Sequence, residues 1–327
     1  MILVTGANGL IGSFICKELN AHGLAFKALV RPSSDLGLLN DLPAECLVHG
    51  DMLDQTSLEE AMEGVTCIIH AAAMLSFHKK DRRRMRLVNV EGTRLLVNLA
   101  LKTGTRYFIH ISSVAALGRP NRAGIVDESS QWTPSKWNTY YAETKYQAEL
   151  EVWRGIQENL DAVIINPSVV LGPGDWGRSS TKIFKYTWNE KRYYTDGRLN
   201  YVDVRDVSNI VRQLVEKRIS GERFIVNAGG MSYKDFFTLA ASKMNKRPPS
   251  KKAPYWALRI AVVFEQLKWI FTGKTPSITK ESARVSKNQI SYDNTKILRE
   301  LNFTFAGIDE TLEWTCGEFL KKNQYQK

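Results

Sequence analysis

The stretch ILVTGANGLIG, residues 2–12, decides the fold. Its apolar run is followed by Gly6, Gly9 and Gly12 at three-residue spacing, and then by an amphipathic segment at Phe14–Asn20. This order predicts a strand, a tight turn and a helix start. Glycine lets the backbone approach phosphates, and the N–H groups at the helix start attract them. We therefore expect the turn to hold a dinucleotide pyrophosphate, although its G-x-x-G-x-x-G spacing differs from the usual G-x-G-x-x-G fingerprint.

Apolar runs alternate with helical patterns through the first half of the chain. This alternation predicts βαβ units and a parallel sheet with helices on both faces. The predicted strands are Ile2–Thr5, Ala25–Val30, Glu45–His49, Cys67–His70, Tyr107–Ser112 and Ala162–Pro167. The predicted helices are Ile11–Ala21, Asp54–Glu63 with a capping box from Ser57 to Glu60, Met85–Leu101 and Tyr141–Asn159. We predict an α/β fold of the Rossmann type with a doubly wound parallel sheet.

The pattern changes after Pro167, where Gly172–Asp175 breaks the chain. The elements predicted beyond it are strands at Tyr201–Val204 and Arg223–Asn227 and helices at Asp206–Lys217, Tyr233–Met244 and Glu310–Lys321. We expect residues 1–166, with a segment 201–228 that returns to the sheet, to form a dinucleotide-binding domain. Residues 167–200 and 229–327 are expected to form a smaller, mostly helical C-terminal lobe that binds substrate.

Composition narrows the classes of partner. The 327 residues carry a formal charge of +11, and the pI is near 9.4. The positive residues are scattered, and the densest runs, Lys79–Arg84 and Lys246–Lys252, belong to no recognisable nucleic-acid module. We expect these runs to be solvated surfaces and predict no nucleic-acid partner. The positive field favours an anionic cofactor or substrate.

The cysteines, Cys16, Cys46, Cys67 and Cys316, form no C-x-x-C pair and no metal-binding spacing with the five histidines. Reduced thiols, no bound metal and a cytoplasmic location are expected. No signal peptide is predicted, because a strand begins at the first residues. Charged residues interrupt the apolar stretch Tyr255–Thr272 on several sides of a helix. We therefore expect that helix to pack on the body or line a pocket, and not to span a membrane.

Acid–base candidates lie in the middle of the chain. Tyr141 and Lys145 are spaced to share one face of a predicted helix, and a nearby ammonium lowers the pKa of a phenol. This spacing also arises by chance, and the alternative tyrosine, Tyr140, lies off that face. Ser112 and Ser113 end a predicted strand at the edge where parallel sheets bind ligands. A serine hydroxyl at this place can donate a hydrogen bond to a substrate oxygen. The alternative interpretation is that these serines only cap a turn.

Together these features resemble the extended form of the short-chain dehydrogenase/reductase superfamily. Its motifs are T-G-x-x-G-x-x-G, here Thr5–Gly12, and Y-x-x-x-K, here Tyr141 and Lys145, with a serine on an earlier strand. Further similar segments are Gly50–Met52, His70–Ala73, Asn89–Thr93, Asn166–Gly174 and Tyr201–Val207. The resemblance covers nearly the whole chain and is strongest to the dihydroflavonol-reductase-like and 3β-hydroxysteroid-dehydrogenase-like branches.

The resemblance implies roles for the matching residues. Tyr141 would exchange a proton with the substrate oxygen, Ser113 would orient that oxygen, and Lys145 would lower the Tyr141 pKa and bond the nicotinamide ribose. Ser113 is preferred to Ser112 because its distance to Gly118 matches the family pattern. Asn89 would have a structural or a proton-relay role. The expected cofactor-binding set is Thr5, Gly6, Asn8, Gly9, Leu10, Ile11, Gly12, Arg31, Ser33, Ser34, Asp51, Met52, Ala71, Ala72, Ala73, Asn89, Ile111, Ser112, Tyr141, Lys145, Pro167, Ser168 and Val169.

Cofactor choice depends on the end of the second strand, where NAD-specific sites place an acidic residue. Arg31 stands there, followed by Ser33 and Ser34, whereas Asp35 comes too late for the ribose. A guanidinium pairs well with a 2′-phosphate. We therefore expect NADP, with NAD as the alternative and a surface arginine as the plainer interpretation.

The leading hypothesis is an NADP-dependent oxidoreductase that transfers a hydride between nicotinamide and a carbonyl or secondary alcohol of a small, fairly apolar substrate. The alternatives are an NAD-dependent sugar-nucleotide epimerase on the same scaffold and a non-enzymatic cofactor sensor. Val114 and Ala115 after Ser113 argue against dehydration. Aromatic residues that either pack in the core or contact substrate are Trp132, Tyr140, Trp176, Tyr186, Trp188, Trp256 and Trp269. Relatives often form homodimers through two helices, here Met85–Leu101 and Tyr141–Asn159, but the oligomeric state stays open.

Overall fold

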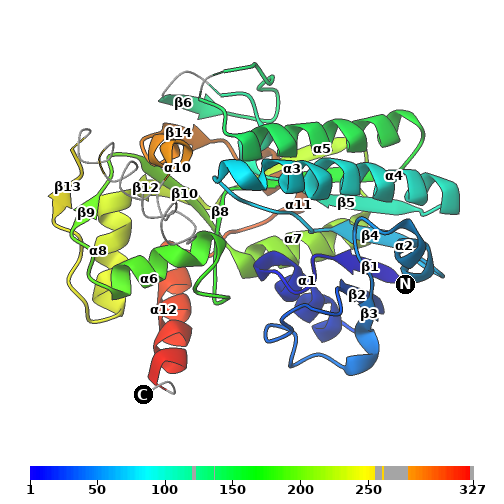
Figure 1. The fold of residues 1–327 in the computed structure, drawn as a ribbon, viewed down its shortest axis with the longest axis horizontal. Helices are drawn as coiled ribbons and strands as arrows, with labels where there is room; N and C mark the ends of the chain where they lie inside the picture. The colour runs from blue at the N-terminus through cyan, green and yellow to red at the C-terminus, as the bar shows by residue number, and fades with distance from the viewer. Residues whose placement is uncertain (120–122, 136, 255–259, 261–278, 325–327) are drawn as a thin grey trace.

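The computed structural model of the 327-residue chain describes residues 1–119, 123–135, 137–254, 260 and 279–324 (Figure 1). The predicted helix Tyr255–Thr272, with Trp256 and Trp269, lies outside the described residues except for Ile260. Within the part of the chain that the structure describes, no helix is both long and apolar enough to cross a membrane.

A seven-stranded parallel sheet forms the centre of the molecule, with strand order β11-β7-β5-β4-β1-β2-β3. Its strands are β1 Ile2–Thr5, β2 Phe26–Val30, β3 Leu47–His49, β4 Cys67–His70, β5 Tyr107–Ile111, β7 Ala162–Pro167 and β11 Glu222–Val226. The chain runs outward from β1 toward β3 and then in the other direction from β4. The order therefore reverses between β1 and β4, and such a switch point opens a crevice at the carboxyl ends of the strands.

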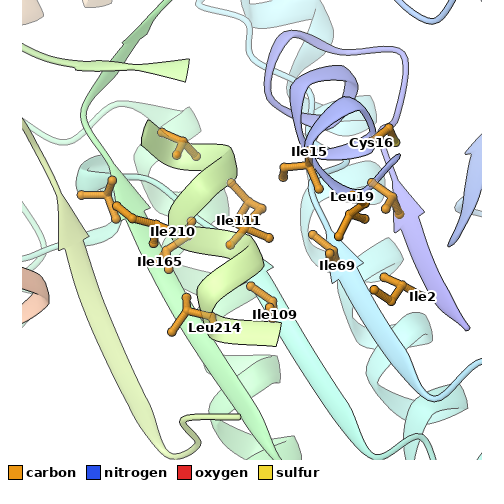
Figure 2. Close-up of a cluster of buried hydrophobic side chains, with 14 of the residues drawn as sticks. Ile2, Ile15, Cys16, Leu19, Ile69, Ile109, Ile111, Ile165, Ile210 and Leu214 are labelled. Carbon is orange, nitrogen blue, oxygen red and sulfur yellow. The ribbon is translucent and has the colours of Figure 1, made fainter. Parts of the chain in front are cut away.

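Helices cover both faces of this sheet (Figure 1). One face carries α1 Leu10–Ala21, α7 Val204–Lys217 and α11 Thr295–Leu301, and the other carries α2 Gln55–Ala61, α4 Gly92–Thr103 and α5 Tyr140–Gln157. Figure 2 shows Leu19 of α1 and Ile210 and Leu214 of α7 lying against isoleucines of the central strands. Each such fully buried side chain contributes about 1.5–3 kcal/mol to stability. The predicted Rossmann-type, doubly wound sheet is confirmed.

A second group of elements has its own core, which includes Phe184, Phe236, Leu312 and Phe319. Its strands are β8 Val169–Leu171, β10 Arg198–Asp203 and β12 Gly229–Ser232 in one sheet, and β9 Tyr193–Tyr194 and β13 Lys251–Lys252 in another. Its helices are α6 Lys182–Trp188, α8 Tyr233–Lys243 and α12 Ile308–Gln324. The strands β6 Ala123–Val126 and β14 Gln289–Tyr292 pair nearby, beside α10 Lys280–Val285 (Figure 1).

Several local predictions need correction. The predicted strand Tyr201–Val204 falls in β10, which pairs with β8 and β12, so only β11 of segment 201–228 joins the main sheet. The capping box at Ser57 is wrong, because Asp54 caps α2 by accepting from the Thr56 N–H. Other shifts are small. The start of the strand predicted at Glu45–His49 is a 3₁₀ turn, Ala44–Cys46, and the helix predicted at Met85–Leu101 is divided into α3 Arg82–Arg86, a π-helical turn Leu87–Glu91 and α4.

The expected aromatic surface is mostly packed within the protein. Trp176 and Trp188 contact Phe319 in the second core, and Tyr186 packs against Phe237. Trp132 stacks on Tyr146 with ring centroids 4.6 Å apart, and Arg82 lies 4.9 Å from the Tyr140 ring. Of the aromatic residues predicted from the sequence, those that the structure describes thus contact other side chains of the chain.

Candidate active site

The glycine-rich turn after β1 is closed against its surroundings. Gly6 has a φ of +68°, a conformation that side chains other than glycine's rarely adopt, and its carbonyl accepts from the Gly9 N–H at 3.0 Å. A Cβ on Gly6 would lie 2.6 Å from the Ala72 Cα, and one on Gly12 would lie 2.9 Å from the Ala7 Cα. The glycines are therefore required by close backbone approach at these two positions.

This turn suits a pyrophosphate. Gly9 is the N-cap of α1 without a side-chain cap, and the first turn of α1 holds no acidic residue. The first N–H groups of a helix have no partner inside the helix, and they favour anions. Leu10, Ile11 and Gly12 supply these groups. The turn lies beside the reversal between β1 and β4, so its position and donor chemistry fit a dinucleotide such as NAD or NADP.

Arg31 follows β2 directly and its side chain is exposed. The Arg31 N–H donates to the Ser34 hydroxyl at 3.2 Å, and the Ser34 N–H donates back to the Arg31 carbonyl at 2.9 Å. Asn8 of the glycine turn donates to the Asp35 carbonyl at 3.4 Å, whereas the Asp35 carboxylate accepts from the Gly37 N–H. The turn after β2, which also holds the exposed Ser33, therefore lies beside the glycine turn, with its acidic side chain engaged elsewhere.

Residues expected near the adenine and along the cleft occupy the ends of β3 and β4. Asp51 accepts from the Leu53 N–H, and Met52 is buried and lies near Gly92. The Ala71 N–H donates to the Thr5 carbonyl at 3.2 Å, and the Ala72 N–H donates to the Thr5 hydroxyl at 3.4 Å. These bonds join the loops after β1 and β4, while Ala73 is exposed.

Asn89 is buried on the π-helical turn. Its side-chain oxygen accepts from the Met74 N–H at 2.7 Å, and its amide nitrogen donates to the Met74 carbonyl at 2.9 Å and to the Thr144 hydroxyl at 3.1 Å. Thr144 in turn donates to the Tyr141 carbonyl at 2.8 Å. Asn89 thus connects the segment after β4 to the helix that carries Tyr141, which favours its structural role.

Tyr141, Ser113 and Lys145 come together where α5 begins beside the end of β5. Tyr141 is half-buried, and burial raises the pKa of Tyr141 to about 12, although a hydrogen bond with the Ser113 side chain opposes the rise. Ser113 Oγ also accepts from the Ala115 N–H at 3.1 Å. Tyr141 is therefore a neutral phenol at neutral pH, with its proton available for donation.

Lys145 is fully buried, and its Nζ donates to the Ile111 carbonyl at 2.8 Å. Burial lowers the pKa of Lys145 to about 8, which the nearby Glu149 carboxylate opposes. The predicted lowering of the Tyr141 pKa by Lys145 is not found in this structure, in which the Lys145 ammonium is directed to a backbone carbonyl.

The remaining expected residues lie at the same edge of the sheet. The Ser112 N–H donates to the Ile165 carbonyl at 2.8 Å, and the Ser168 N–H donates to the Val226 carbonyl at 3.0 Å. The Ser168 hydroxyl is buried without a hydrogen-bond partner in the structure, whereas the buried Ser112 side chain lies close enough to the Glu149 carboxylate to lower its pKa. Pro167 ends β7 and Val169 begins β8, so these residues border the carboxyl edge on the side of the second core.

Sequence reasoning missed a buried polar layer behind this site. His70 bonds the Thr5 and Thr93 hydroxyls at 2.8 and 2.9 Å, and burial lowers the pKa of His70 to about 3. Burial likewise keeps the pKa of the neighbouring His110 well below its usual value. Glu149, Asn166 and Arg223 form a second group. The sequence does hold one signal for this group: Glu149 comes four residues after Lys145, so the two share a face of the predicted helix. Among the described residues, no three His, Cys, Asp or Glu side chains are placed to hold a metal ion.

The architecture and the glycine turn are those of an extended short-chain dehydrogenase/reductase, the class of NAD(P)-dependent reductases, dehydrogenases and epimerases. Residues 2–229 match the model of the NAD dependent epimerase/dehydratase family, which covers most of the chain. The chain belongs to this family, as its sequence motifs predict.

Relatives agree with this assignment. The chain is 30% identical over 315 residues to a Synechocystis sp. protein named "Putative dihydroflavonol 4-reductase", covering 94% of this chain and 91% of that protein. It is 30% identical over 320 residues to sterol demethylase protein B of Methylococcus capsulatus, covering 95% of this chain and 97% of that protein. The crystal structure of gox2253 superposes with a TM-score of 0.83 at 30% identity, covering 99% of both chains. The family and these relatives support an NAD(P)-dependent oxidoreductase.

Proposed function

We propose that the protein is an NADP-dependent reductase of a ketone or aldehyde group, able to run in reverse on a secondary alcohol. The observation that carries this proposal is the meeting of a neutral Tyr141, the Ser113 side chain and the buried Lys145 at the end of β5, in the same sheet as the strand before the glycine turn. A neutral phenol is the form that donates a proton, as carbonyl reduction requires.

The chain's own residues act on the substrate oxygen. Ser113 Oγ accepts from the Ala115 N–H, and its O–H, which lies beside the Tyr141 hydroxyl, would turn toward a carbonyl oxygen and orient it. The Tyr141 hydroxyl then donates its proton to that oxygen as negative charge develops there. In the proposed reaction the Lys145 ammonium would favour the phenolate left on Tyr141, an effect that the neutral phenol of the structure does not show. The nicotinamide, when bound, supplies or accepts the hydride at the carbonyl carbon.

The preference for NADP rests on Arg31. Its guanidinium is exposed after β2, next to the turn that Asn8 joins to the glycine loop, and no described carboxylate pairs with it. A free guanidinium is suited to bidentate bonds with a 2′-phosphate, and Ser33 and Ser34 offer hydroxyls beside it. Asp35 is engaged with Gly37, so it does not take the place of a ribose-binding carboxylate.

We propose that the substrate binds between the residues at the carboxyl edge and the second lobe, 167–200 and 229–327. That lobe has a core rich in aromatic side chains. The names of relatives, a dihydroflavonol reductase and cinnamoyl-CoA reductases, support a carbonyl substrate of low polarity. The proposed reaction is therefore reduction of a small, fairly apolar carbonyl compound.

The cofactor content of the purified protein and its nucleotide affinities test this proposal. The reductase should be isolated without retained nucleotide and should bind NADPH more tightly than NADH. It should also oxidise NADPH when a panel of aromatic and alicyclic ketones and aldehydes is supplied. Tightly retained NAD, with epimerisation of sugar nucleotides and no NADPH oxidation, would assign the chain to the epimerases instead.

A further inference from the structure

A carboxylate is buried one helical turn beyond Lys145. Glu149 lies on the same face of α5 and is 1% exposed, as is Lys145. Taking an unpaired charge out of water is costly, so a buried carboxylate requires partners that offset its desolvation. The chain places Glu149 in the polar layer behind the proposed catalytic group and not at the solvent face of the helix.

Two side chains from neighbouring strands hold this carboxylate. Asn166, at the end of β7, donates from Nδ2 to Glu149 Oε1 at 2.6 Å and to the Ser113 carbonyl at 2.9 Å. Arg223 of β11 places Nη1 3.4 Å from Glu149 Oε2. The Asn166 amide therefore connects the Glu149 carboxylate to the backbone of the serine that orients the substrate in the proposed reaction.

The other titratable groups around this layer have further partners or are uncharged. Arg223 also donates to the Glu128 carbonyl at 2.6 and 2.9 Å, and the Glu128 carboxylate accepts from the Ile225 N–H. His70 and His110, on β4 and β5, are neutral because burial lowers the pKa of each.

The charges farther along the packed helices are paired elsewhere. Glu91 pairs with Arg86 and Arg94, and Glu151 pairs with Arg154. Arg82 of α3 pairs with Glu281.

We propose that Glu149 is a positioning residue that keeps Lys145 cationic inside the protein and, through Asn166, fixes the backbone of Ser113. This inference rests on the proposed function, in which Lys145 and Ser113 both serve Tyr141. Burial lowers the pKa of Lys145 and the Glu149 carboxylate opposes that effect, in agreement with the geometry. Burial raises the pKa of Glu149 itself, opposed first by the side chain of Ser112 and then by the Asn166 hydrogen bond, Arg223 and Lys145.

Titration of Lys145 in the cofactor-free enzyme tests the proposal. The ¹³Cε resonance of Lys145 is assigned by its loss in Lys145→Met, and its titration midpoint is compared between the wild type, Glu149→Gln and the control Glu151→Gln. We expect Glu149→Gln to lower the midpoint by about one unit or more, because a buried cation loses its anion. We expect Glu151→Gln, on the outer face of the same helix, to leave it unchanged. An unchanged midpoint in a folded Glu149→Gln protein would overturn the proposal.

A second variant decides the case in which Glu149→Gln does not fold. Adding Lys145→Met removes the cation that Glu149 is proposed to balance. The double variant should therefore have a higher thermal unfolding midpoint than Glu149→Gln alone. A double variant no more stable than the single one would refute the pairing. Because neither measurement uses substrate or cofactor, failure here is distinct from failure of the proposed reductase activity, which is measured separately with NADPH.

Discussion

Gly6 lies directly against Ala72, so that a Cβ on Gly6 would come within 2.6 Å of the Ala72 Cα and backbone nitrogen. Since Gly6 follows β1 and Ala72 follows β4, this approach holds the two loops together at the point where the strand order reverses. The Thr5 hydroxyl, which accepts from the Ala72 N–H, adds a polar bond to the same junction. The turn proposed to bind the pyrophosphate therefore depends on the absence of a side chain at residue 6.

Replacing Gly6 by alanine tests this junction. The added methyl group would clash with the backbone of Ala71 and Ala72, and the alanine would have to keep the positive φ of Gly6. We therefore expect a loss of about 2–4 kcal/mol in the free energy of unfolding. NADPH affinity should fall along with it. Gly307→Ala is the matched control, because its methyl group would point into open space, with no described neighbour within 4 Å. Thermal unfolding and NADPH titration measure both effects, and wild-type values for Gly6→Ala would exclude the proposed packing.

Reversing the charge at residue 31 tests cofactor choice. Arg31→Asp removes the guanidinium proposed for the 2′-phosphate and supplies a carboxylate suited to a ribose 2′-hydroxyl. We expect the NADPH-to-NADH affinity ratio to fall at least about tenfold, since a charge-assisted bond contributes about 1.5–3 kcal/mol. Arg192→Asp, in the second lobe, should leave the ratio unchanged. If calorimetric titration finds the same ratio in Arg31→Asp as in the wild type, Arg31 does not select the cofactor.

Asp206 provides a test of stability against pH. Burial raises the pKa of Asp206 to about 6 from 3.8, so the folded protein binds its proton more tightly than the unfolded chain. The contribution of Asp206 to the free energy of unfolding therefore falls as pH rises from about 4 to 6. Above pH 6 the full cost of burying the charged carboxylate remains.

Asp206→Asn removes this cost while its amide oxygen still accepts from the Ala306 N–H. We expect a gain of about 1–2 kcal/mol at pH 7.5 and no gain below pH 4, since each pKa unit equals about 1.4 kcal/mol and solvent screens part of the effect. The exposed Asp161→Asn is the control for general charge effects. Denaturant unfolding at both pH values measures the difference, and equal or lower stability of Asp206→Asn at pH 7.5 contradicts the account.

The sequence predicts best where local signals agree with the fold. The segment from Ile2 to Gly12 contains an apolar strand, an obligatory glycine turn and a helix start in adjacent residues, so its structure follows from neighbours in the chain. The same holds for the strands at Cys67–His70 and Ala162–Pro167, whose predicted bounds match β4 and β7. Two nearby cap-forming residues, Asp54 and Ser57, compete, and the local pattern selected the wrong one.

Prediction fails where the answer depends on strand pairing far along the chain. β10 pairs with β8 and β12 through contacts that its own residues do not specify. The partners of Glu149 come from β7 and β11, and the burial that raises the Tyr141 pKa depends on packing of distant segments. Motifs therefore identify which residues form the site, whereas their protonation states require the assembled structure.

Turnover of a Tyr141→Phe variant tests the central claim most directly. The variant keeps the ring and loses only the hydroxyl, so NADPH affinity and thermal stability should remain close to those of the wild type. We predict that NADPH oxidation with an active ketone or aldehyde falls by about 10²–10⁴-fold, the usual contribution of a general acid. Oxidation of NADPH by Tyr141→Phe at the wild-type rate would contradict the proposed role of Tyr141.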